Sequence, residues 1–360
     1  MVKHMAAINQ TNIQKLTRDT EEYKPTVPMK YFGKSCNGTL VVEQSAQKLL
    51  NPKTSPRWLT YHADSVEVLQ ALPENVIDFS IFSPPFASLY TYTNSERDLG
   101  NSHSYKEFFE HFRFIIPELL RVTTPGRLLV CHCANIPATK EHDTYIGIKN
   151  FRGHLVDAFE AAGFIYHSEV VIRKDPLVEA TRSKAIGLLH KQIIKDSAIS
   201  RQGLPDYLIV LRKPGTNPKA IQHRPVGFER YIGTRPAPKS KPTDNPMTNK
   251  FSHEVWQRYA DPVWSDVSQT DTLQFREVRE EKDERHICPL QLPVIARALE
   301  LWTLPNDLVL SPFMGIGSEG YMALRMKRRF IGIELKASYY QMAVKNLIKA
   351  ANTPERKALF

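Results

Sequence analysis

From Trp58 onward, apolar positions along the chain alternate between two patterns. Short apolar runs predict strands, and longer stretches with apolar residues at helical spacing predict helices. In the first half we expect strands at 58–62, 76–82, 127–132, 164–172 and 207–211, and helices at 66–72, 105–122 and 154–162. Alternation of this kind predicts a doubly wound α/β fold with a mostly parallel sheet.

Two prolines modify this prediction. Pro117 lies inside the expected helix 105–122, where it is expected to kink the helix. Pro125 and Gly126 are expected to form the turn that leads into strand 127–132. The alternation then resumes at Pro289, with helices expected at 289–301 and 338–349 and strands at 308–310 and 330–333.

A glycine-rich turn follows the strand at 308–310. Gly315, Gly317 and Gly320 fit the spacing G-x-G-x-x-G, and Glu334 ends the next strand. Glycines let the backbone approach a ligand, and a carboxylate at this position can accept hydrogen bonds from ribose hydroxyls. The motif suits a nicotinamide cofactor as well as S-adenosylmethionine. The turn is expected to open a helix that leads to the strand at 330–333, and only one more helix follows this unit. The rest of its sheet must therefore come from upstream residues, in a circularly permuted order.

A second loop, Ser83-Pro84-Pro85-Phe86, follows the strand at 76–82. In a doubly wound sheet, ligands bind at the carboxyl ends of the strands. The amino group of a base is a poor nucleophile, because its lone pair is delocalised into the ring. The Ser83 hydroxyl and the Pro84 carbonyl could accept its protons, and Phe86 could stack on a base turned out of the duplex.

The segment 214–283 differs in composition, being rich in proline, basic residues and aromatic residues. Such a composition favours an inserted DNA-recognition region, and the alternative is a solvated, proline-rich connection with a few packed aromatic residues. Basic residues that could extend the region are Arg182, Lys184, Lys191, Lys195 and Arg201. The expected organisation is a polar extension at 1–55, a catalytic half at 56–213, the recognition insertion at 214–283 and a cofactor-binding half at 284–360.

The net charge of +10 and the pI of about 9.3 favour a polyanionic partner such as nucleic acid. The cysteines are Cys36, Cys131, Cys133 and Cys288, too few for a disulfide scaffold. Cys131-His132-Cys133 lies in an apolar strand without a second ligand pair, so buried thiols are favoured over a metal site. We see no signal peptide and no run long enough to span a bilayer, and expect a cytoplasmic protein.

Taken in order, the motifs resemble those of DNA amino-methyltransferases, the N4-cytosine and N6-adenine group, in their permuted β-type order. The overall sequence also resembles methyltransferases carried by bacteriophages, which would place the protein in a bacterial host. The residues that carry the family resemblance are Ala63-Asp64, Ser83-Pro84-Pro85-Phe86, His286-Ile287-Cys288-Pro289, Ser311-Pro312-Phe313-Met314-Gly315-Ile316-Gly317 and Gly332-Ile333-Glu334.

The resemblance implies a Rossmann-like methyltransferase fold, S-adenosyl-L-methionine as cofactor, no metal, and double-stranded DNA as partner; a homodimer is compatible with it. It implies that Phe313, Gly315 and Gly317 wrap the methionine part of the cofactor. Glu334 would hold the ribose, Asp64 would lie near the adenine, and His286 to Pro289 would close the methionine end. Ser83 to Phe86 would engage the target base.

Two residues depart from the family pattern: Ser311 replaces the usual Asp, and Ala63 replaces a Gly. Ser311 removes a carboxylate expected near the cofactor's ammonium group. Ser83 as the first loop residue favours cytosine N4 over adenine N6 as the target. Cytosine-C5 chemistry fits poorly, because the chain has no Pro-Cys dipeptide. The remaining alternatives are a nicotinamide-dependent oxidoreductase and a non-catalytic DNA-binding relative.

Overall fold

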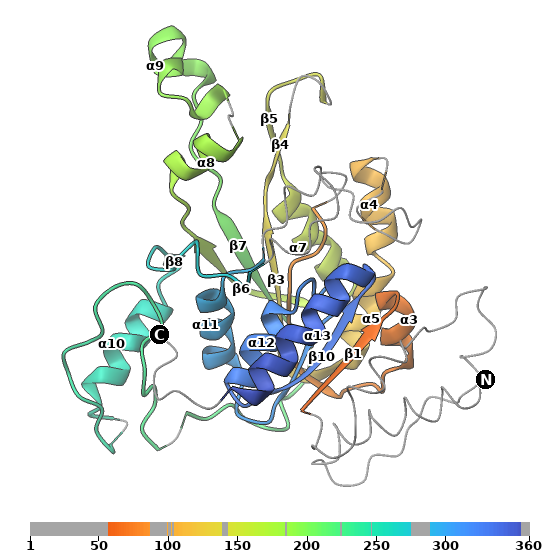
Figure 1. Cartoon of the computed structure of the whole chain (residues 1–360), viewed down its shortest axis with the longest axis vertical. Helices are drawn as coiled ribbons and strands as arrows, with labels where there is room; N and C mark the ends of the chain where they lie inside the picture. The colour runs from red at the N-terminus through yellow and green to blue at the C-terminus, as the bar shows by residue number, and fades with distance from the viewer. Residues whose placement is uncertain are drawn as a thin grey trace.

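A computed structural model describes residues 57–86, 99, 102, 104–138, 143–183, 186–223, 225–245, 247–274 and 289–353. Its main feature is an eight-stranded sheet with the order β1-β10-β9-β2-β3-β7-β6-β8 (Figure 1). The strands are β1 (Trp58–His62), β2 (Ile77–Phe82), β3 (Thr123–Ala134), β6 (Ile165–Ile172), β7 (Asp206–Arg212), β8 (Val263–Trp264), β9 (Leu308–Ser311) and β10 (Arg329–Glu334).

The sheet is parallel from β1 through β3, and β7 runs antiparallel to both β3 and β6. The late strands β9 and β10 lie between the early strands β1 and β2. The prediction that the glycine-rich unit completes its sheet with upstream strands is therefore confirmed, as is the mostly parallel doubly wound fold.

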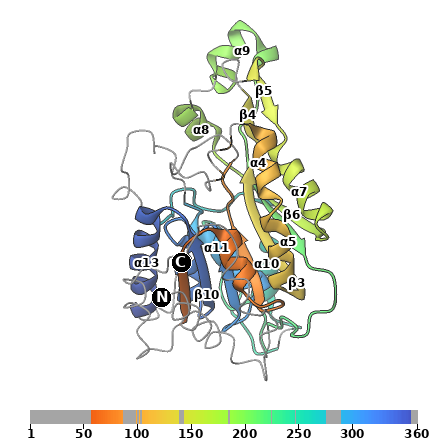
Figure 2. The same cartoon turned by 90° about the vertical axis from the view of Figure 1, so that its right-hand side faces the viewer.

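Helices cover both faces of the sheet (Figure 2). On one face α11 packs on α12 and α12 on α13; on the other, α3 packs on α5, and α7 packs on β3, β6 and β7. Arg121 of α5 donates to the carbonyls of Leu69 and Leu72 at the end of α3. The helices are α3 (Ser65–Ala71), α4 (Tyr105–Phe112), α5 (Ile115–Val122), α7 (Phe151–Ala161), α11 (Leu292–Trp302), α12 (Ser318–Arg325) and α13 (Ala337–Asn352).

Two details differ from the sequence prediction. The expected helix 105–122 is two helices that break at Arg113 and Phe114, and Pro117 does not cause the break. Pro117 lies in the first turn of α5, where its missing N–H has no acceptor within the helix to lose. Pro125 and Gly126 lie within β3 at an irregularity in its pairing with β2, so the strand begins earlier than expected.

The segment after β7 packs against the core along much of its length. It contains α10 (Lys250–Tyr259), and the side chains of Ile232, Val255 and Trp264 are buried. The fully buried Arg297 of α11 donates to the Ile232 carbonyl at 2.7 Å. Its guanidinium also lies 2.8 Å from the Asp266 carboxylate. Packed side chains therefore anchor this segment to the core, among many residues that are exposed.

Two projections extend from the end of the sheet that carries the carboxyl ends of its parallel strands (Figures 1 and 2). One is the hairpin β4 (Ile136–Ala138) and β5 (Gly147–Lys149), which continues from β3. The other lies between β6 and β7 and comprises α8 (Pro176–Ser183), η4 (Ile186–Leu188), α9 (Lys191–Lys195) and η5 (Ser197–Ile199).

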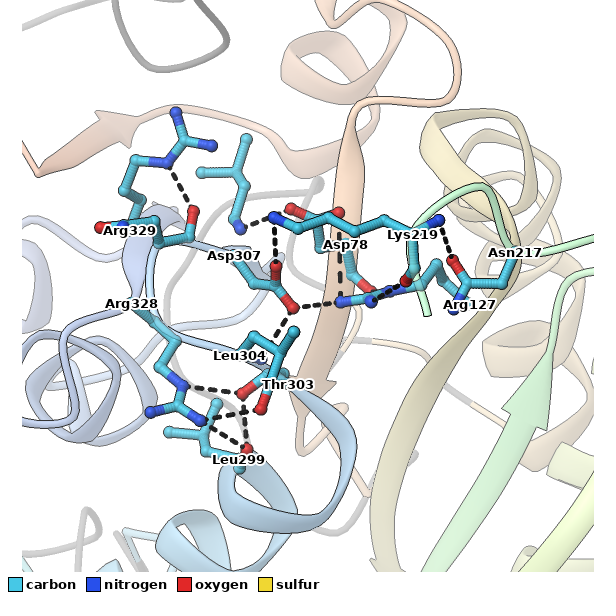
Figure 3. Close-up of polar contacts among 12 residues, drawn as sticks. Asp78, Arg127, Asn217, Lys219, Leu299, Thr303, Leu304, Asp307, Arg328 and Arg329 are labelled. Atoms are coloured by element: carbon cyan, nitrogen blue, oxygen red, sulfur yellow. Dashed lines mark hydrogen bonds and ion pairs between the residues drawn. The ribbon is translucent and has the colours of Figure 1, made fainter. Parts of the chain in front are cut away.

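A buried polar network joins the two halves at the opposite end of the sheet (Figure 3). Arg127 of β3 pairs with the fully buried Asp307, which directly precedes β9. Asp307 also accepts from Lys219 at 3.4 Å and from the Leu304 amide at 2.9 Å. Asp78 of β2 accepts from the Leu308 amide at 2.8 Å. Residues from the segments 56–213 and 284–360 thus share one network, which the segment after β7 joins through Lys219.

Several sequence predictions lie outside the described residues: the extension 1–55, Cys36, His286 and Cys288. Within the described ranges, no helix combines the length and the apolar character needed to cross a membrane.

Candidate active site

The motif-bearing loops meet at one edge of the sheet. Ser83 follows β2, Ser311 ends β9, Glu334 ends β10 and Asp64 follows β1. Because these four strands are parallel, their carboxyl ends lie at the same edge. Sequence segments from both halves of the chain therefore form one candidate site.

The glycine turn has an open side. Gly315 has φ +50°, and a Cβ at this position would meet no atom within 4 Å. Gly317 has φ +86°, and a Cβ there would lie 3.1 Å from the Ala343 side chain of α13. Gly317 therefore permits close packing of α13, whereas Gly315 leaves room beside the backbone for a ligand.

Glu334 holds this turn from the neighbouring strand. One carboxylate oxygen accepts from the Gly315 amide at 2.9 Å and the other from the Lys336 amide at 2.8 Å. The Ala63 amide donates to the Glu334 carbonyl at 3.2 Å, which sets the turn after β1 beside them. Asp64 caps α3, accepting from the Val66 amide at 2.8 Å. The structure thus brings Asp64, Glu334 and Gly315 together.

Two buried polar side chains lie before and after the glycine turn. Ser311 is fully buried, and its hydroxyl has no hydrogen-bond partner among the described residues. Glu319, in the first turn of α12, is also buried. Burial, with a contribution from Glu334, raises the pKa of Glu319 to about 8. A buried hydroxyl without a partner and a buried neutral carboxyl are groups that a polar ligand could engage.

Phe313, in the glycine turn, packs beside the strand that leads into the Ser83-Pro84-Pro85-Phe86 loop. Its ring lies 5.8 Å from that of Phe82, the last residue of β2, and 6.4 Å from that of Phe112 in α4. Ser80 pairs with Leu310 in the sheet, so the loops that follow β2 and β9 leave from neighbouring strands. Groups bound by the two loops would therefore be neighbours.

The Ser83-Pro84-Pro85-Phe86 loop contacts His132 of β3, which in turn lies beside Asp206 of β7. The half-buried Ser83 forms a hydrogen bond of 2.8 Å between its hydroxyl and Nδ1 of His132. Nε2 of His132 lies 3.2 Å from the Asp206 carboxylate, whose other oxygen lies 2.6 Å from Lys174 Nζ. The Phe86 ring packs edge-on against Phe151 at 5.9 Å. The loop is thus held by a chain of polar contacts and an aromatic contact.

His132 and Asp206 were not predicted as site residues from the sequence. In the sequence His132 stands between two cysteines, and no motif marks Asp206. One feature of the sequence points to His132. Side chains alternate along a strand, so His132 faces the side opposite to Cys131 and Cys133. Cys131 and Cys133 are buried, and burial raises both thiol pKa values. Within the described ranges, no His, Cys, Asp and Glu side chains gather into a metal-binding group.

The comparison with protein families decides the assignment. Residues 77–345 match the family model described as DNA methylase, which covers N6 and N4 methyltransferases. The chain belongs to this family. The resemblance inferred from the ordered motifs is confirmed, and the oxidoreductase alternative has no support from it.

Relatives of this DNA methylase include the type II methyltransferase M.BglII of Bacillus subtilis, 24% identical over 79% of this chain and 67% of that protein. M.Cfr9I of Citrobacter freundii is 23% identical over 80% of this chain and 86% of that protein. The resemblance to bacteriophage methyltransferases stays a prediction.

Among solved structures, TTHA0409 of Thermus thermophilus, complexed with S-adenosyl-L-methionine, matches with a TM-score of 0.54. It is 20% identical, and the match covers 82% of this chain and 96% of that one. The cytosine-N4-specific PvuII DNA methyltransferase matches with a TM-score of 0.51 at 14% identity, over 82% of this chain and 94% of that one. These likenesses establish the fold.

Proposed function

We propose that this DNA methylase transfers a methyl group from S-adenosylmethionine to the exocyclic amine of a base turned out of duplex DNA. The observation that carries the proposal is the adjacency of the Ser83 loop and the Gly315 turn, which Phe313 bridges. When bound, the cofactor supplies an electrophilic methyl group. The protein's own residues hold the cofactor and the base side by side and accept the proton that the amine gives up.

The residues around the glycine turn suit that cofactor. The open side of Gly315 leaves room for it, and the Glu334 carboxylate stands at the end of β10, where ribose hydroxyls could donate to it. The free hydroxyl of Ser311 stands at the position where the family pattern has an Asp near the ammonium group, and the buried carboxyl of Glu319 follows in the first turn of α12. In this proposal Glu319 ionises when the positive charge of the ligand approaches.

The first loop residue favours cytosine N4 as the target. A hydroxyl accepts a proton less strongly than the Asp or Asn more common in adenine-N6 members, and Ser83 is paired with His132. M.BglII and M.Cfr9I carry names that specify no base, whereas YhdJ of Escherichia coli (strain K12), 35% identical over 80 residues, is a DNA adenine methyltransferase. The preference for cytosine therefore rests on Ser83.

We further propose that the two projections approach the DNA. Residues 173–205 contain seven Lys and Arg against three Asp and Glu, a net charge of +4. Arg173, Lys191 and Lys195 are exposed, and the projection starts from the edge that carries Ser83. The expected recognition insertion at 214–283 instead contains α10, which lies beside α11 and apart from both projections (Figure 1).

Charge reversal distinguishes the two candidate surfaces. Lys191→Glu with Lys195→Glu should weaken DNA binding and reduce its salt dependence, because each phosphate contact releases counterions. The matched control is Lys239→Glu with Lys241→Glu, two exposed lysines near α10. We expect the first pair to weaken binding at least about tenfold more than the second, measured by fluorescence anisotropy at several salt concentrations. If the Lys239→Glu, Lys241→Glu pair weakens binding more than the Lys191→Glu, Lys195→Glu pair, the 214–283 segment would be the DNA-contacting surface.

The function itself is tested by nucleoside mass spectrometry of DNA incubated with the enzyme and labelled S-adenosylmethionine. We expect N4-methylcytosine, and no product from the variant with Pro84→Ala and Phe86→Ala. N6-methyladenine would show that the base assignment is wrong. An absence of label in either nucleoside, with DNA of varied sequence, would support a non-catalytic DNA-binding relative. Sedimentation of the purified protein tests whether it forms a homodimer.

A further inference from the structure

The hydroxyl of Ser83 is the first of four neighbouring polar groups that lead away from the base-binding loop. It contacts Nδ1 of His132 at 2.8 Å, and Nε2 on the other side of the ring lies 3.2 Å from Asp206. Lys174 follows at 2.6 Å from the far oxygen of Asp206. His132 and Asp206 are 7% and 3% exposed, so water has little access to the chain between its two ends.

Strand direction explains how these groups meet. Ser83 follows the end of β2 and His132 lies near the end of the adjacent parallel strand β3. The next strand, β7, is antiparallel, so its first residue, Asp206, lies at the same edge of the sheet. Lys174 follows β6, which again runs parallel to β3. Four elements therefore contribute one group each.

The charge state of Asp206 determines which group donates in the hydrogen bond between Ser83 and His132. Burial alone would raise the pKa of Asp206, but its contacts with His132 and Lys174 outweigh burial and lower it. Asp206 is therefore a carboxylate, and a carboxylate beside Nε2 favours the tautomer with its proton on that nitrogen. Nδ1 is then the acceptor, and the Ser83 hydroxyl donates to it. This arrangement leaves the lone pairs of the Ser83 oxygen for the protons of the target amine.

We propose that His132 is a positioning residue and proton acceptor that acts through Ser83, with Asp206 holding its tautomer. This inference rests on the proposed function. After methylation, the base nitrogen carries one proton more than the neutral product. That N–H bond breaks as the proton passes to the Ser83 oxygen, while the Ser83 proton passes to Nδ1 of His132. The result is a neutral methylated amine, an intact serine and an imidazolium beside the Asp206 carboxylate. The proton returns through the Ser83 hydroxyl to solvent once the product has left the loop.

The relay also gives a reason for serine in this loop. A hydroxyl alone is a weak proton acceptor, whereas a hydroxyl that can pass its own proton to an imidazole accepts more readily. Two charged side chains lie near this imidazole. Asp206 of β7 contacts it directly, and Lys174, which follows β6, contacts Asp206.

The test compares His132→Asn with a matched control, His154→Asn. The first variant offers an amide oxygen near the position of Nδ1 but cannot take up a proton. It thus preserves the hydrogen bond to Ser83 while removing the proton acceptor. His154 is the appropriate control because its Nδ1 also contacts a hydroxyl, that of Tyr105, at 2.8 Å, but at an exposed position outside the relay.

The measurement is the single-turnover rate of methyl transfer to unmethylated DNA between about pH 6 and pH 9, with enzyme in excess and labelled S-adenosylmethionine. We expect His132→Asn to lower the rate at least about 100-fold with unchanged cofactor and DNA affinity, as for loss of a general base. The wild-type rate should rise with pH through one ionisation, which disappears in His132→Asn. His154→Asn should keep the wild-type rate and profile.

A second variant, Asp206→Asn, keeps the test decisive where His132→Asn fails to fold. Without the carboxylate the imidazolium is less stable, so the rising limb of the profile should move to lower pH and the rate should fall. Wild-type rates and profiles in the folded variants would overturn the proposal. A wild-type enzyme that methylates no DNA would instead overturn the proposed function, and the relay with it.

Discussion

Asp307→Asn tests whether the buried network below the site holds the two halves of the chain together. The Asp307 carboxylate pairs with Arg127 and accepts from Lys219 and from the Leu304 amide. Arg127 is 1% exposed and Asp307 is fully buried, so neither charge is solvated when its partner is lost. The substitution keeps the shape of the side chain and removes its charge.

The expected loss of stability follows from what remains around Arg127. Removing one partner of a buried ion pair costs about 3–5 kcal/mol, because it leaves the other charge uncompensated. Asp78 lies 4.0 Å from the same guanidinium, so it compensates part of that charge. Burial, and then the charge of Asp307, raises the pKa of Asp78, so removing Asp307 favours its ionisation. We therefore expect a loss at the lower end, about 3 kcal/mol.

Urea unfolding followed by circular dichroism measures the change. The midpoint should fall with little change in slope, as expected when stability changes and the exposed surface does not. Lys219→Met is the control, since Lys219 contacts the same carboxylate but its side chain is 60% exposed, and it should cost less than about 1 kcal/mol. An Asp307→Asn variant within about 1 kcal/mol of wild type would refute the role of the network.

Three further predictions concern the cofactor site. Glu334→Ala should weaken S-adenosylmethionine binding by about 1–3 kcal/mol in calorimetry, through lost charged hydrogen bonds, and an unchanged affinity would contradict the ribose role. Gly315→Ala should lower that affinity at least about tenfold by filling the open side of the turn, whereas Gly126→Ala, whose Cβ would clash with the Asn217 backbone, should lower stability alone. Burial raises the pKa of Glu319 from 4.5 to about 8, so wild type should lose stability relative to Glu319→Gln as pH rises between these values, by up to about 1.4 kcal/mol per pH unit in urea unfolding. A constant difference between the two proteins would contradict the buried neutral carboxyl.

Apolar periodicity predicted the sheet well, because most of its strands are buried on both faces and read as apolar runs. The strand at 58–62 has the expected bounds. The break at Arg113 and Phe114 was not predicted, because apolar residues on both sides keep helical spacing across it. Helix α10 was missed for a different reason. Its buried residues Phe251, Val255 and Tyr259 are four apart, but prolines dominate the segment before it.

The site was predictable where function depends on backbone shape and local sequence. The glycine turn and the double proline are local features, and both lie at the expected edge of the sheet. The relay is different, because Ser83, His132 and Asp206 come from separate strands. Their contact depends on the order of β2, β3 and β7 and on the reversed direction of β7. A sequence pattern within any one strand contains none of this information.

Because the chain order is permuted, the network around Asp307 at the amino ends of the strands also affects the position of the two loops at the opposite end. β9 and β2 are far apart in sequence, so side-chain and sheet contacts set the distance between the Gly315 turn and the Ser83 loop. Their register pairs Phe79 with Val309 and Ser80 with Leu310. A slip of one residue would turn the following side chains to opposite faces of the sheet. The hydrogen bond from the Leu308 amide to the Asp78 carboxylate, at 2.8 Å, holds this register, because each of these residues directly precedes the first paired residue of its strand. Weakening that end of the junction should therefore disturb catalysis at the other end as well as stability.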